Sequence, residues 1–428
     1  MKPELISDCV HCGFCLPSCP TYVLWREEMD SPRGRIHLMD GLVKATLPLT
    51  GTVVKHFDRC LGCMACVTAC PSGVQYDRLI ETTRAHVETE FGRTLGERLL
   101  RRAIFSVFPH RRRLAAAMRL APLGRRLPLP SRLRALAELA PARRSTAWPA
   151  ERTPASNTVL LAENRVGLLV GCVQSVLFGH VNVATARVLA ADGYEVACPR
   201  GQRCCGALSV HGGRLGEGLE LARRTIDTFE EYDLVVTNAA GCGSNMKDYR
   251  HLLADDAAYA ERAAAFSAKV RDVSELLADP LAERAERHPL ELRVAFQDSC
   301  HLRHAQRITA EPRAALTSVP GLVLLEPAEQ ELCCGSAGIY NIVQADAARS
   351  LGDRKAANIL ATEPDAYASA NPGCLVQVSA ALRRAGAAIP AVHPIELIDA
   401  SIRGHAAFLS ASRNGATNGW TPEDGVTA

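Results

Sequence analysis

Eight cysteines near the start of the chain have a spacing that suits iron–sulfur chemistry. They fall in two runs, CVHCGFCLPSCP at residues 9–20 and CLGCMACVTACP at residues 60–71, and both read CxxCxxCxxxCP. Gaps of two residues let one tight loop present three thiolates to one cluster, while the fourth cysteine of each run ligates the other cluster. The pattern therefore predicts two [4Fe-4S] clusters. The predicted ligands are Cys9, Cys12, Cys15 and Cys70 for the first cluster, and Cys60, Cys63, Cys66 and Cys19 for the second.

Structural zinc and disulfides are the alternative interpretations of these thiols. Zinc sites usually combine two CxxC pairs or include histidine at a fixed spacing, whereas here two complete four-cysteine runs repeat with the same proline. No apolar signal segment with a cleavage site is visible at the N-terminus, so we expect the chain in the reducing cytoplasm, where thiols persist. Both alternatives are therefore disfavoured.

The composition is that of a globular protein of several domains. The chain has 428 residues, of which 47% are hydrophobic, 22% charged and 5% aromatic, and its formal net charge is +3. This length predicts two to four domains with cores of their own. The small net charge and the scarcity of aromatic residues give nucleic-acid binding no support. No apolar run approaches the roughly 20 residues that cross a bilayer, so peripheral contact with the inner face of the cytoplasmic membrane is the membrane association left open.

Eight further cysteines belong to an internal duplication. Cys172, Cys204-Cys205-Gly206 and Cys242 recur as Cys300, Cys333-Cys334-Gly335 and Cys374, at offsets of 300 − 172 = 128, 333 − 204 = 129 and 374 − 242 = 132. An offset this constant and this large indicates two homologous domains instead of a solenoid repeat. Four thiols per copy match the ligand count of a further cluster. We expect such a cluster in the second copy more than in the first. Buried structural thiols, zinc and a redox disulfide at the vicinal pair are the alternatives.

Strands predicted just before these cysteines bring them together. RVGLLVGC at residues 165–172 and RVAFQDSC at residues 293–300 read as buried strands, as do DLVVTNAAGC at residues 233–242 and AYASANPGC at residues 366–374. Helical patterns lie between them, so each copy is predicted to form a parallel sheet in an α/β domain. The carboxyl edge of such a sheet is where its ligands bind.

The segment between the two N-terminal runs is predicted to be helical. Apolar residues recur at helical spacing after Ser31 and Pro32, which form a helix start signal. A helical ferredoxin domain is therefore expected, not a small β-rich one. Arg33, Arg35 and His37 are read as a solvated helix face, with shielding of the charge of a cluster as the alternative.

An arginine-rich segment follows the second run. From Arg93 to Arg152 there are fifteen arginines, no lysine and three glutamates, a balance of 15 − 3 = +12. Apolar residues lie between the arginines, and prolines interrupt the helical stretches. The segment is interpreted as a docking surface for an acidic partner subunit, as a membrane-surface helix, or as a linker packed on its own domains. The apolar residues include Leu99, Leu100, Ile104 and Phe105, and the prolines that break the helical pattern are Pro109, Pro122, Pro128 and Pro130.

Three stretches resemble the iron–sulfur subunits of bacterial glycolate oxidase, and the resemblance extends over nearly the whole chain. They are CVHCGFCLPSCPTY, SPRGRIHLMDGL and RCLGCMACVTACPSGVQYDRL. The duplicated cysteines resemble the CCG domains of heterodisulfide reductase subunits. The family's CCG pattern closes with CxxC, but Asn245 and Gln377 stand here at the place of the last cysteine. The resemblance implies a multidomain α+β fold, with an α-helical ferredoxin domain followed by two tandem α/β CCG domains.

The resemblance also implies an electron-transfer role in an oxidoreductase complex. The chain has no GxGxxG after a strand and no P-loop, so FAD is expected on FAD-binding oxidase subunits that convert glycolate to glyoxylate. Electrons are then expected to pass through the clusters to a quinone or another acceptor. The alternatives are a heterodisulfide-reductase-type catalytic subunit, or the equivalent subunit of a lactate or glycerol-3-phosphate dehydrogenase. No catalytic residue is assigned.

The expected domains follow from these motifs. They are the ferredoxin domain at 1–92, the arginine-rich connector at 93–158, the first CCG domain at 159–288, the second at 289–408, and a disordered tail at 409–428.

Three single side chains stand apart from the cluster motifs. His301 and His304 are expected to be hydrogen-bonded polar groups, with metal ligation as the alternative. Cys198 has no counterpart in the second copy and is expected to be a packed thiol.

Overall fold

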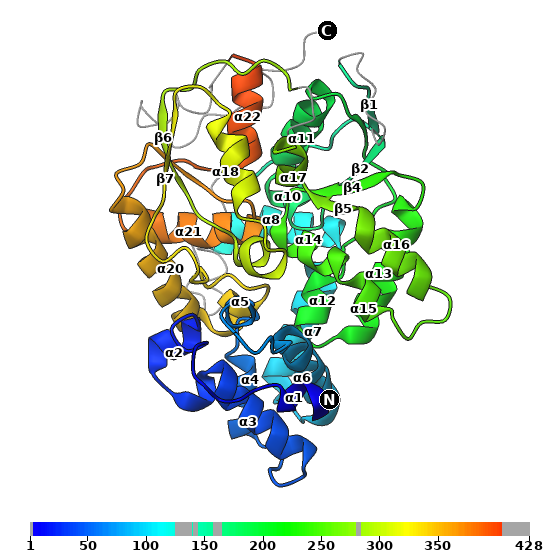
Figure 1. Cartoon of the computed structure of the whole chain (residues 1–428), viewed down its shortest axis with the longest axis vertical. Coiled ribbons are helices and arrows are strands. Elements are labelled where there is room, and N and C mark those ends of the chain that lie inside the picture. Colours follow the sequence, from blue (N-terminus) through cyan, green and yellow to red (C-terminus); the bar gives the residue numbers. More distant parts are fainter. Residues whose placement is uncertain (1–2, 125–138, 140–143, 157–164, 280–283, 405–428) are drawn as a thin grey trace.

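The computed structural model of the chain describes residues 3–124, 139, 144–156, 165–279 and 284–404 (Figure 1). The tail expected at 409–428 lies outside these residues, as do Pro128 and Pro130 of the arginine-rich segment. Among the described residues, no helix has the length and apolar character needed to cross a membrane.

The N-terminal domain is helical, as predicted. Its α3 begins at the expected signal, because the Ser31 side chain accepts a hydrogen bond from the Gly34 amide at 3.0 Å and Pro32 occupies the first helical position. The elements are α1 Pro3–Ser7, α2 Pro20–Trp25, the 3₁₀ turn η1 Glu28–Asp30, α3 Pro32–Val43, α4 Gly51–Asp58, α5 Ala65–Thr68 and α6 Tyr76–Glu90.

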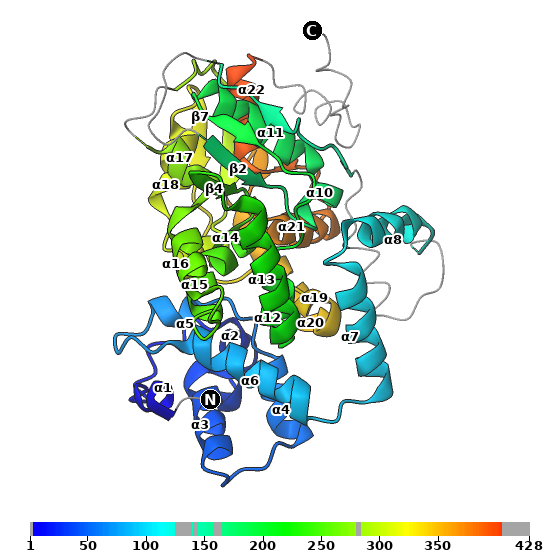
Figure 2. The same ribbon diagram turned by 90° about the vertical axis from the view of Figure 1, so that its right-hand side faces the viewer.

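Two further helices, α7 Leu95–Val107 and α8 Arg111–Gly124, lie along one side of the molecule (Figure 2). One face of α7 is packed, because Ile104 and Phe105 are buried. The Phe105 ring contacts Gly212 of the first CCG domain so closely that a side chain at position 212 would collide with it. Another face is open, with Leu95 at 64% and Leu99 at 58% exposure. The arginine-rich segment therefore packs on its own domains and still presents apolar surface.

The first CCG domain is built on a five-stranded sheet in the order β1-β3-β2-β4-β5. All neighbours are parallel except the edge strand β1, which pairs antiparallel with β3. The strands are β1 Arg152–Thr153, β2 Arg165–Leu169, β3 Glu195–Ala197, β4 Leu234–Thr237 and β5 Val270–Asp272. The helices are α10 Gln174–Leu177, α11 Gly179–Ala191, α12 Ala207–His211, α13 Leu215–Phe229, α14 Ala240–Lys247, α15 Tyr249–Leu252, α16 Ala260–Lys269 and α17 Val273–Leu277.

The second CCG domain repeats this plan on a four-stranded parallel sheet in the order β7-β6-β8-β9. The strands are β6 Leu292–Phe296, β7 Leu322–Leu325, β8 Ala366–Ala368 and β9 Ala391–Val392. The helices are the π-helical turn η2 His301–Ala305, α18 Ala310–Thr317, α19 Tyr340–Val343, α20 Ala345–Leu360, α21 Pro372–Arg384 and α22 Pro394–Ile402. Each of the four strands predicted before a cysteine is present.

One hydrophobic core joins the two CCG domains. Helices α11 and α22 pack against each other, and the core they share includes Val181 and Leu397. The buried His393 of the second domain contacts the Asn238 carbonyl of the first at 2.8 Å. Cys198 is fully buried in the same core, which raises its pKa to about 12, so it is a packed thiol as predicted. The ferredoxin domain lies below both sheets (Figure 1).

Candidate iron–sulfur site

The backbone of the two ferredoxin runs bends in the same way at the same places. The third residue of each run is left-handed, with φ of 54° at His11 and 64° at Gly62, and so is the fifth, with 89° at Gly13 and 63° at Met64. Alternating right- and left-handed residues turn successive amides to one side and form the concave anion sites seen around iron–sulfur clusters. Side-chain-bearing residues such as His11 and Met64 keep this conformation only where the surroundings hold it. The backbone of both runs thus fits an anionic cluster.

The structure brings four cysteines from both runs around one small cavity. Cys19, Cys60, Cys63 and Cys66, which we call the inner quartet, line about 20 Å³ of space together with Arg35 and Tyr76. Burial raises the pKa of Cys66 well above its ordinary value, and the other three thiols of the quartet raise it further. All four side chains are buried.

The other four cysteines, Cys9, Cys12, Cys15 and Cys70, form the outer quartet. Burial raises the pKa of Cys9, and the neighbouring Cys70 and Cys12 raise it further. Cys12 is exposed and the other three are half-buried. Among the described residues, no three His, Cys, Asp or Glu side chains lie close enough together to bind a single metal ion. A four-iron cluster does not need such a group, because each of its thiolates binds a different iron.

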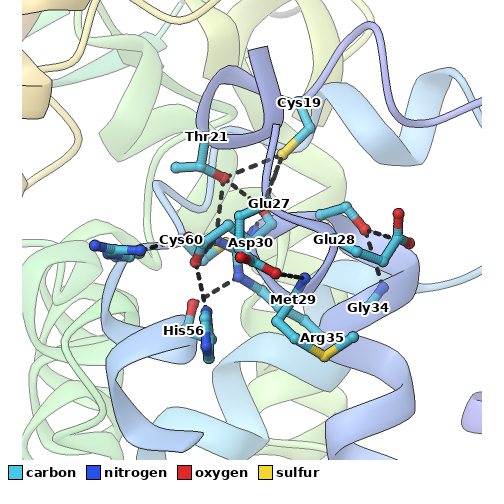
Figure 3. A network of polar contacts seen from close by, with 12 residues as sticks. Cys19, Thr21, Glu27, Glu28, Met29, Asp30, Gly34, Arg35, His56 and Cys60 are labelled. Atoms are coloured by element: carbon cyan, nitrogen blue, oxygen red, sulfur yellow. Dashed lines mark hydrogen bonds and ion pairs between the residues drawn. The ribbon is translucent and has the colours of Figure 1, made fainter. Parts of the chain in front are cut away.

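A buried arginine lies beside the inner quartet (Figure 3). Arg35 is 1% exposed, and its Nη1 is 3.9 Å from the Cys19 sulfur. Its Nη2 donates to Thr21 Oγ1 at 3.0 Å and its Nε to the His56 carbonyl at 2.7 Å. Burial alone would lower the pKa of Arg35, but Cys60 and its other neighbours raise it, so the side chain stays charged.

The prediction of a solvated face is therefore wrong for Arg35. It holds for His37, which is exposed, while Arg33 is 28% exposed and pairs with Glu28. The charges on a helix cannot reveal its packing, and here the Arg35 side of α3 faces the second run.

The surroundings of Cys60 lower the pKa of its thiol. Burial would raise its pKa, but the charges of Arg35 and Arg84 lower it below the ordinary value. The Gly62 amide donates to its sulfur at 3.4 Å and the Tyr76 hydroxyl at 3.7 Å. Cationic groups and N–H and O–H donors around a thiolate are what a negatively charged cluster requires. The donor set therefore fits an iron–sulfur cluster.

Two histidines fasten the second CCG domain to the ferredoxin domain. His301 Nε2 faces the Gly62 carbonyl at 3.1 Å, and its Nδ1 faces Ser244 Oγ at 2.7 Å. His304 Nε2 faces the Glu331 carbonyl at 3.0 Å, and its Nδ1 faces Thr68 Oγ1 at 2.7 Å. A carbonyl only accepts, so each Nε2 carries the proton and each Nδ1 accepts from a hydroxyl. Both side chains are hydrogen-bonded polar groups, as predicted.

The duplicated cysteines converge at the carboxyl ends of their sheets. The sulfur–sulfur distance is 3.4 Å between Cys172 and Cys204, 3.9 Å between Cys300 and Cys333, and 3.5 Å between Cys334 and Cys374. Cys205 and Cys242 complete the set in the first copy, since each is a close neighbour of the other.

The residues at the place of the missing fifth cysteine bind the backbone. The Asn245 amide donates to the Cys205 carbonyl at 2.8 Å, and the Gln377 amide donates to the Ala348 carbonyl at 2.7 Å. Each copy thus keeps four thiols.

Both CCG quartets line a single cavity of about 290 Å³. Cys60 and Leu61 of the second ferredoxin run line the same cavity. The side chains of Cys63 and Cys333 belong to one hydrophobic cluster. Burial raises the pKa of Cys63, and the nearby Cys333 thiol raises it further. The inner quartet therefore lies directly against the CCG quartet of the second copy.

Four residues around this cavity were not predicted from the sequence. Arg84 donates to the carbonyls of Cys60 and, at 2.9 Å, His211, so it joins the second run to the first CCG domain. His211 Nδ1 is 2.8 Å from a carboxylate oxygen of Glu81. Gln174 and Tyr340 line the cavity as well. None of these belongs to a motif, and only tertiary packing brings them to the site.

The chain combines a helical domain that carries two four-cysteine runs with two domains whose cysteines share a cavity. This combination places it in the class of iron–sulfur electron-transfer proteins. The comparisons with protein families agree. Residues 5–74 match the 4Fe-4S dicluster domain, and residues 166–247 and 294–379 each match the cysteine-rich domain called CCG.

Relatives that match most of the chain identify its family within this class. The chain is 37% identical to the "Probable glycolate oxidase iron-sulfur subunit" of Bacillus subtilis (strain 168), over 91% of this chain and 93% of that protein. It is 36% identical to the "Glycolate oxidase iron-sulfur subunit" of Escherichia coli (strain K12), over 89% and 91%. "Lactate utilization protein A" of an Exiguobacterium strain is 29% identical over 56% of this chain and 98% of that protein. The chain belongs to the family of glycolate oxidase iron–sulfur subunits.

Proposed function

We propose that this chain carries electrons in a complex that oxidises glycolate to glyoxylate. FAD-bearing partner subunits remove two electrons and two protons from the hydroxy acid, and the chain takes the electrons onward to a respiratory acceptor. Support comes from the two relatives named as glycolate oxidase subunits, which this chain matches along about nine tenths of its length. It also comes from the sequence, which has no nucleotide-binding glycine motif to seat a flavin.

The outer and inner quartets are assigned as the ligands of two [4Fe-4S] clusters, which when bound supply single-electron carriers. The observation that carries this assignment is the repeated backbone bend at His11 and Gly62, together with the cavity that the inner quartet shares with Arg35. The exposed Cys12 makes the outer quartet the side that a partner subunit reaches.

A third cluster is proposed for the second CCG copy. Cys300, Cys333, Cys334 and Cys374 are grouped by the sulfur distances given above and lie against the inner quartet. The first copy lacks that neighbour and is assigned no cluster.

Helix α7 is proposed as a docking surface for an acidic partner subunit. Leu95 and Leu99 are exposed beside Arg98 and Arg102, which are exposed as well. Exposed apolar side chains rimmed by one sign of charge are typical of an interaction surface.

Anaerobic reconstitution with iron and sulfide tests the ligand assignment. We expect about eight irons per chain from the two ferredoxin clusters, and about four more from the third. Cys12→Ser and Cys63→Ser should each lose about four of these irons, whereas the control Cys198→Ser should lose none. Binding of four zinc ions with no iron would overturn the assignment.

The assembled complex tests the activity. Glycolate should reduce the clusters only when the flavin subunits are present, and D- or L-lactate should reduce them more slowly. Faster reduction by lactate would show that lactate, and not glycolate, is the substrate of the complex, and would leave the electron-transfer role unchanged.

A further inference from the structure

We propose that Gln202 and Gln330 are positioning residues, whose side-chain amides hold the paired cysteines of each CCG copy against the leading cysteine of the same copy. The cysteines concerned are Cys172 and Cys204-Cys205 in the first copy, and Cys300 and Cys333-Cys334 in the second. The inference rests on the proposed function only in that the second copy is expected to hold a cluster. The matching family is described by its cysteines alone and assigns no role to either glutamine.

In the first copy, a proline ends the ladder of hydrogen bonds between β2 and β3. The last register pair of these parallel strands is Gly167 with Ala197. Two residues further on, Pro199 would stand opposite Leu169. In a parallel ladder, the residue at that place donates its N–H to the carbonyl of residue 168 and accepts from the amide of residue 170. Proline has no N–H, so it cannot make the first of these bonds.

The Gln202 side chain supplies what the proline lacks. Its amide nitrogen donates to the Leu168 carbonyl at 3.2 Å, and its amide oxygen accepts from the Val170 amide at 2.8 Å. A side-chain amide carries one acceptor oxygen and an N–H donor, as a backbone peptide unit does, so it extends the ladder past the proline. We call these two bonds the amide clamp. The clamp lies two residues before Cys172 on the strand side and two residues before Cys204 on the loop side.

The second copy repeats the amide clamp. Pro327 stands two residues after the end of β7, as Pro199 stands two residues after the end of β3. The Gln330 amide nitrogen donates to the Phe296 carbonyl at 2.6 Å, and its amide oxygen accepts from the Asp298 amide at 3.0 Å. The offsets between the copies are 327 − 199 = 128 for the proline and 330 − 202 = 128 for the glutamine, equal to the offset of the leading cysteines. This repetition indicates a role that both copies share.

The amide clamp acts on the loops that carry the paired cysteines. These loops, at residues 198–206 and 326–339, contain no helix or strand. A loop without such bonds has many conformations to lose when its thiols are brought to one place. The clamp ties each loop to the strand that leads to the first cysteine. The sulfur atoms held there are 3.4 Å apart for Cys172 and Cys204, and 3.9 Å apart for Cys300 and Cys333.

Bridging of neighbouring thiols tests the clamp of the first copy in the full-length, iron-loaded chain. The probe is dibromobimane, on which each of two thiolates displaces a bromide, and mass spectrometry identifies the linked peptides. Gln202→Met keeps the length of the side chain and loses both bonds. Bridging between Cys172 and Cys204 should slow about tenfold, which corresponds to about 1.4 kcal/mol. Gln330→Met is the matched control and should leave this rate unchanged.

Iron content tests the clamp of the second copy. Gln330→Met should lower the iron content by about four per chain, and Gln202→Met should not lower it. If the wild-type chain binds only about eight irons, the third cluster is absent and the thiols of Cys300 and Cys333 are free. Bridging between these two thiols should then slow about tenfold in Gln330→Met.

A glutamate variant separates positioning from folding. The ionised carboxyl of Gln202→Glu accepts a hydrogen bond but donates none, whereas its protonated form donates again. Relative to the wild type at the same pH, bridging in this variant should therefore recover as the pH falls from about 8 to about 5.5.

A role in folding alone predicts a different result. The melting temperature would then fall in the variants, while the bridging rate of the folded chain would stay unchanged. That outcome, or equal bridging in the wild type and all variants, would overturn the proposal. Glycolate-driven reduction of the ferredoxin clusters in the wild-type complex is measured separately, so failure of the clamp and failure of the proposed function are distinguishable.

Discussion

Replacement of Arg35 by glutamine should lower the reduction potential of the cluster proposed for the inner quartet. The guanidinium is 1% exposed and 3.9 Å from the Cys19 sulfur. Its carboxylate neighbour Asp30 is 3.5 Å away and is paired more closely with Arg59, at 2.6 Å, so the charge of Arg35 remains to offset negative charge in a place that water does not screen. Across roughly 7 Å to the centre of the charge, at an effective dielectric constant of about 20, one unit charge is worth about 2 kcal/mol. For a one-electron couple this corresponds to about 100 mV. The potential falls because the reduced cluster carries the extra negative charge.

Two matched variants separate charge from structure. Arg35→Lys keeps the charge and should retain most of the wild-type potential, although it loses part of the fork that binds Thr21 and the His56 carbonyl. Arg33→Gln removes a charge that is 28% exposed and paired with Glu28, so its effect should be small.

The measurement is an anaerobic redox titration followed by electron paramagnetic resonance, on protein with verified iron content. An unchanged potential in Arg35→Gln with all clusters in place would refute the electrostatic role of this arginine. Equal shifts in Arg35→Gln and Arg35→Lys would assign the effect to the hydrogen bonds instead of the charge.

Two other predictions concern the contact between the CCG domains and the docking surface. Burial lowers the pKa of His393 from 6.5 to about 4, and the neutral ring donates from Nε2 to the Asn238 carbonyl. The unfolded chain binds a proton at this histidine below pH 6.5, whereas the folded chain does so only near pH 4. The folding stability contributed by the neutral ring is therefore complete above pH 6.5 and is lost as the pH falls towards 4. The loss should approach about 3 kcal/mol in thermal melts, and His393→Gln should flatten that part of the pH profile. The double variant Arg98→Glu/Arg102→Glu should weaken association with the partner subunits more than tenfold in pull-down titrations, whereas Arg200→Glu, on the exposed surface of the first CCG domain, should not. Loss of binding to anionic vesicles, with subunit association intact, would mark α7 as a membrane surface.

The sequence predicted those parts of the fold that local patterns determine. The helical ferredoxin domain follows from a cap at Ser31 and the apolar spacing after it, and the strands before Cys172 and Cys300 follow from short, mainly apolar runs that each include a valine. The antiparallel edge strand β1 was not predicted, because two residues carry no periodicity.

The surroundings of the site depend on contacts between distant segments. Arg35 and Arg84 are two among many arginines, and only the packing of α3 and α6 against the second run makes them neighbours of Cys60. Gln174 and Tyr340 stand in short helices with no motif, so the sequence gives no reason to single them out.

The position of the inner quartet constrains the order in which the protein is assembled. His301 covers the Gly62 carbonyl, and Cys333 shares a buried cluster with Cys63, so the second run is closed over once the CCG domains dock. The cluster proposed for the inner quartet can therefore take up iron and sulfide only while the ferredoxin domain and the CCG domains are apart. The outer quartet, with Cys12 exposed, stays open to loading and repair in the finished molecule.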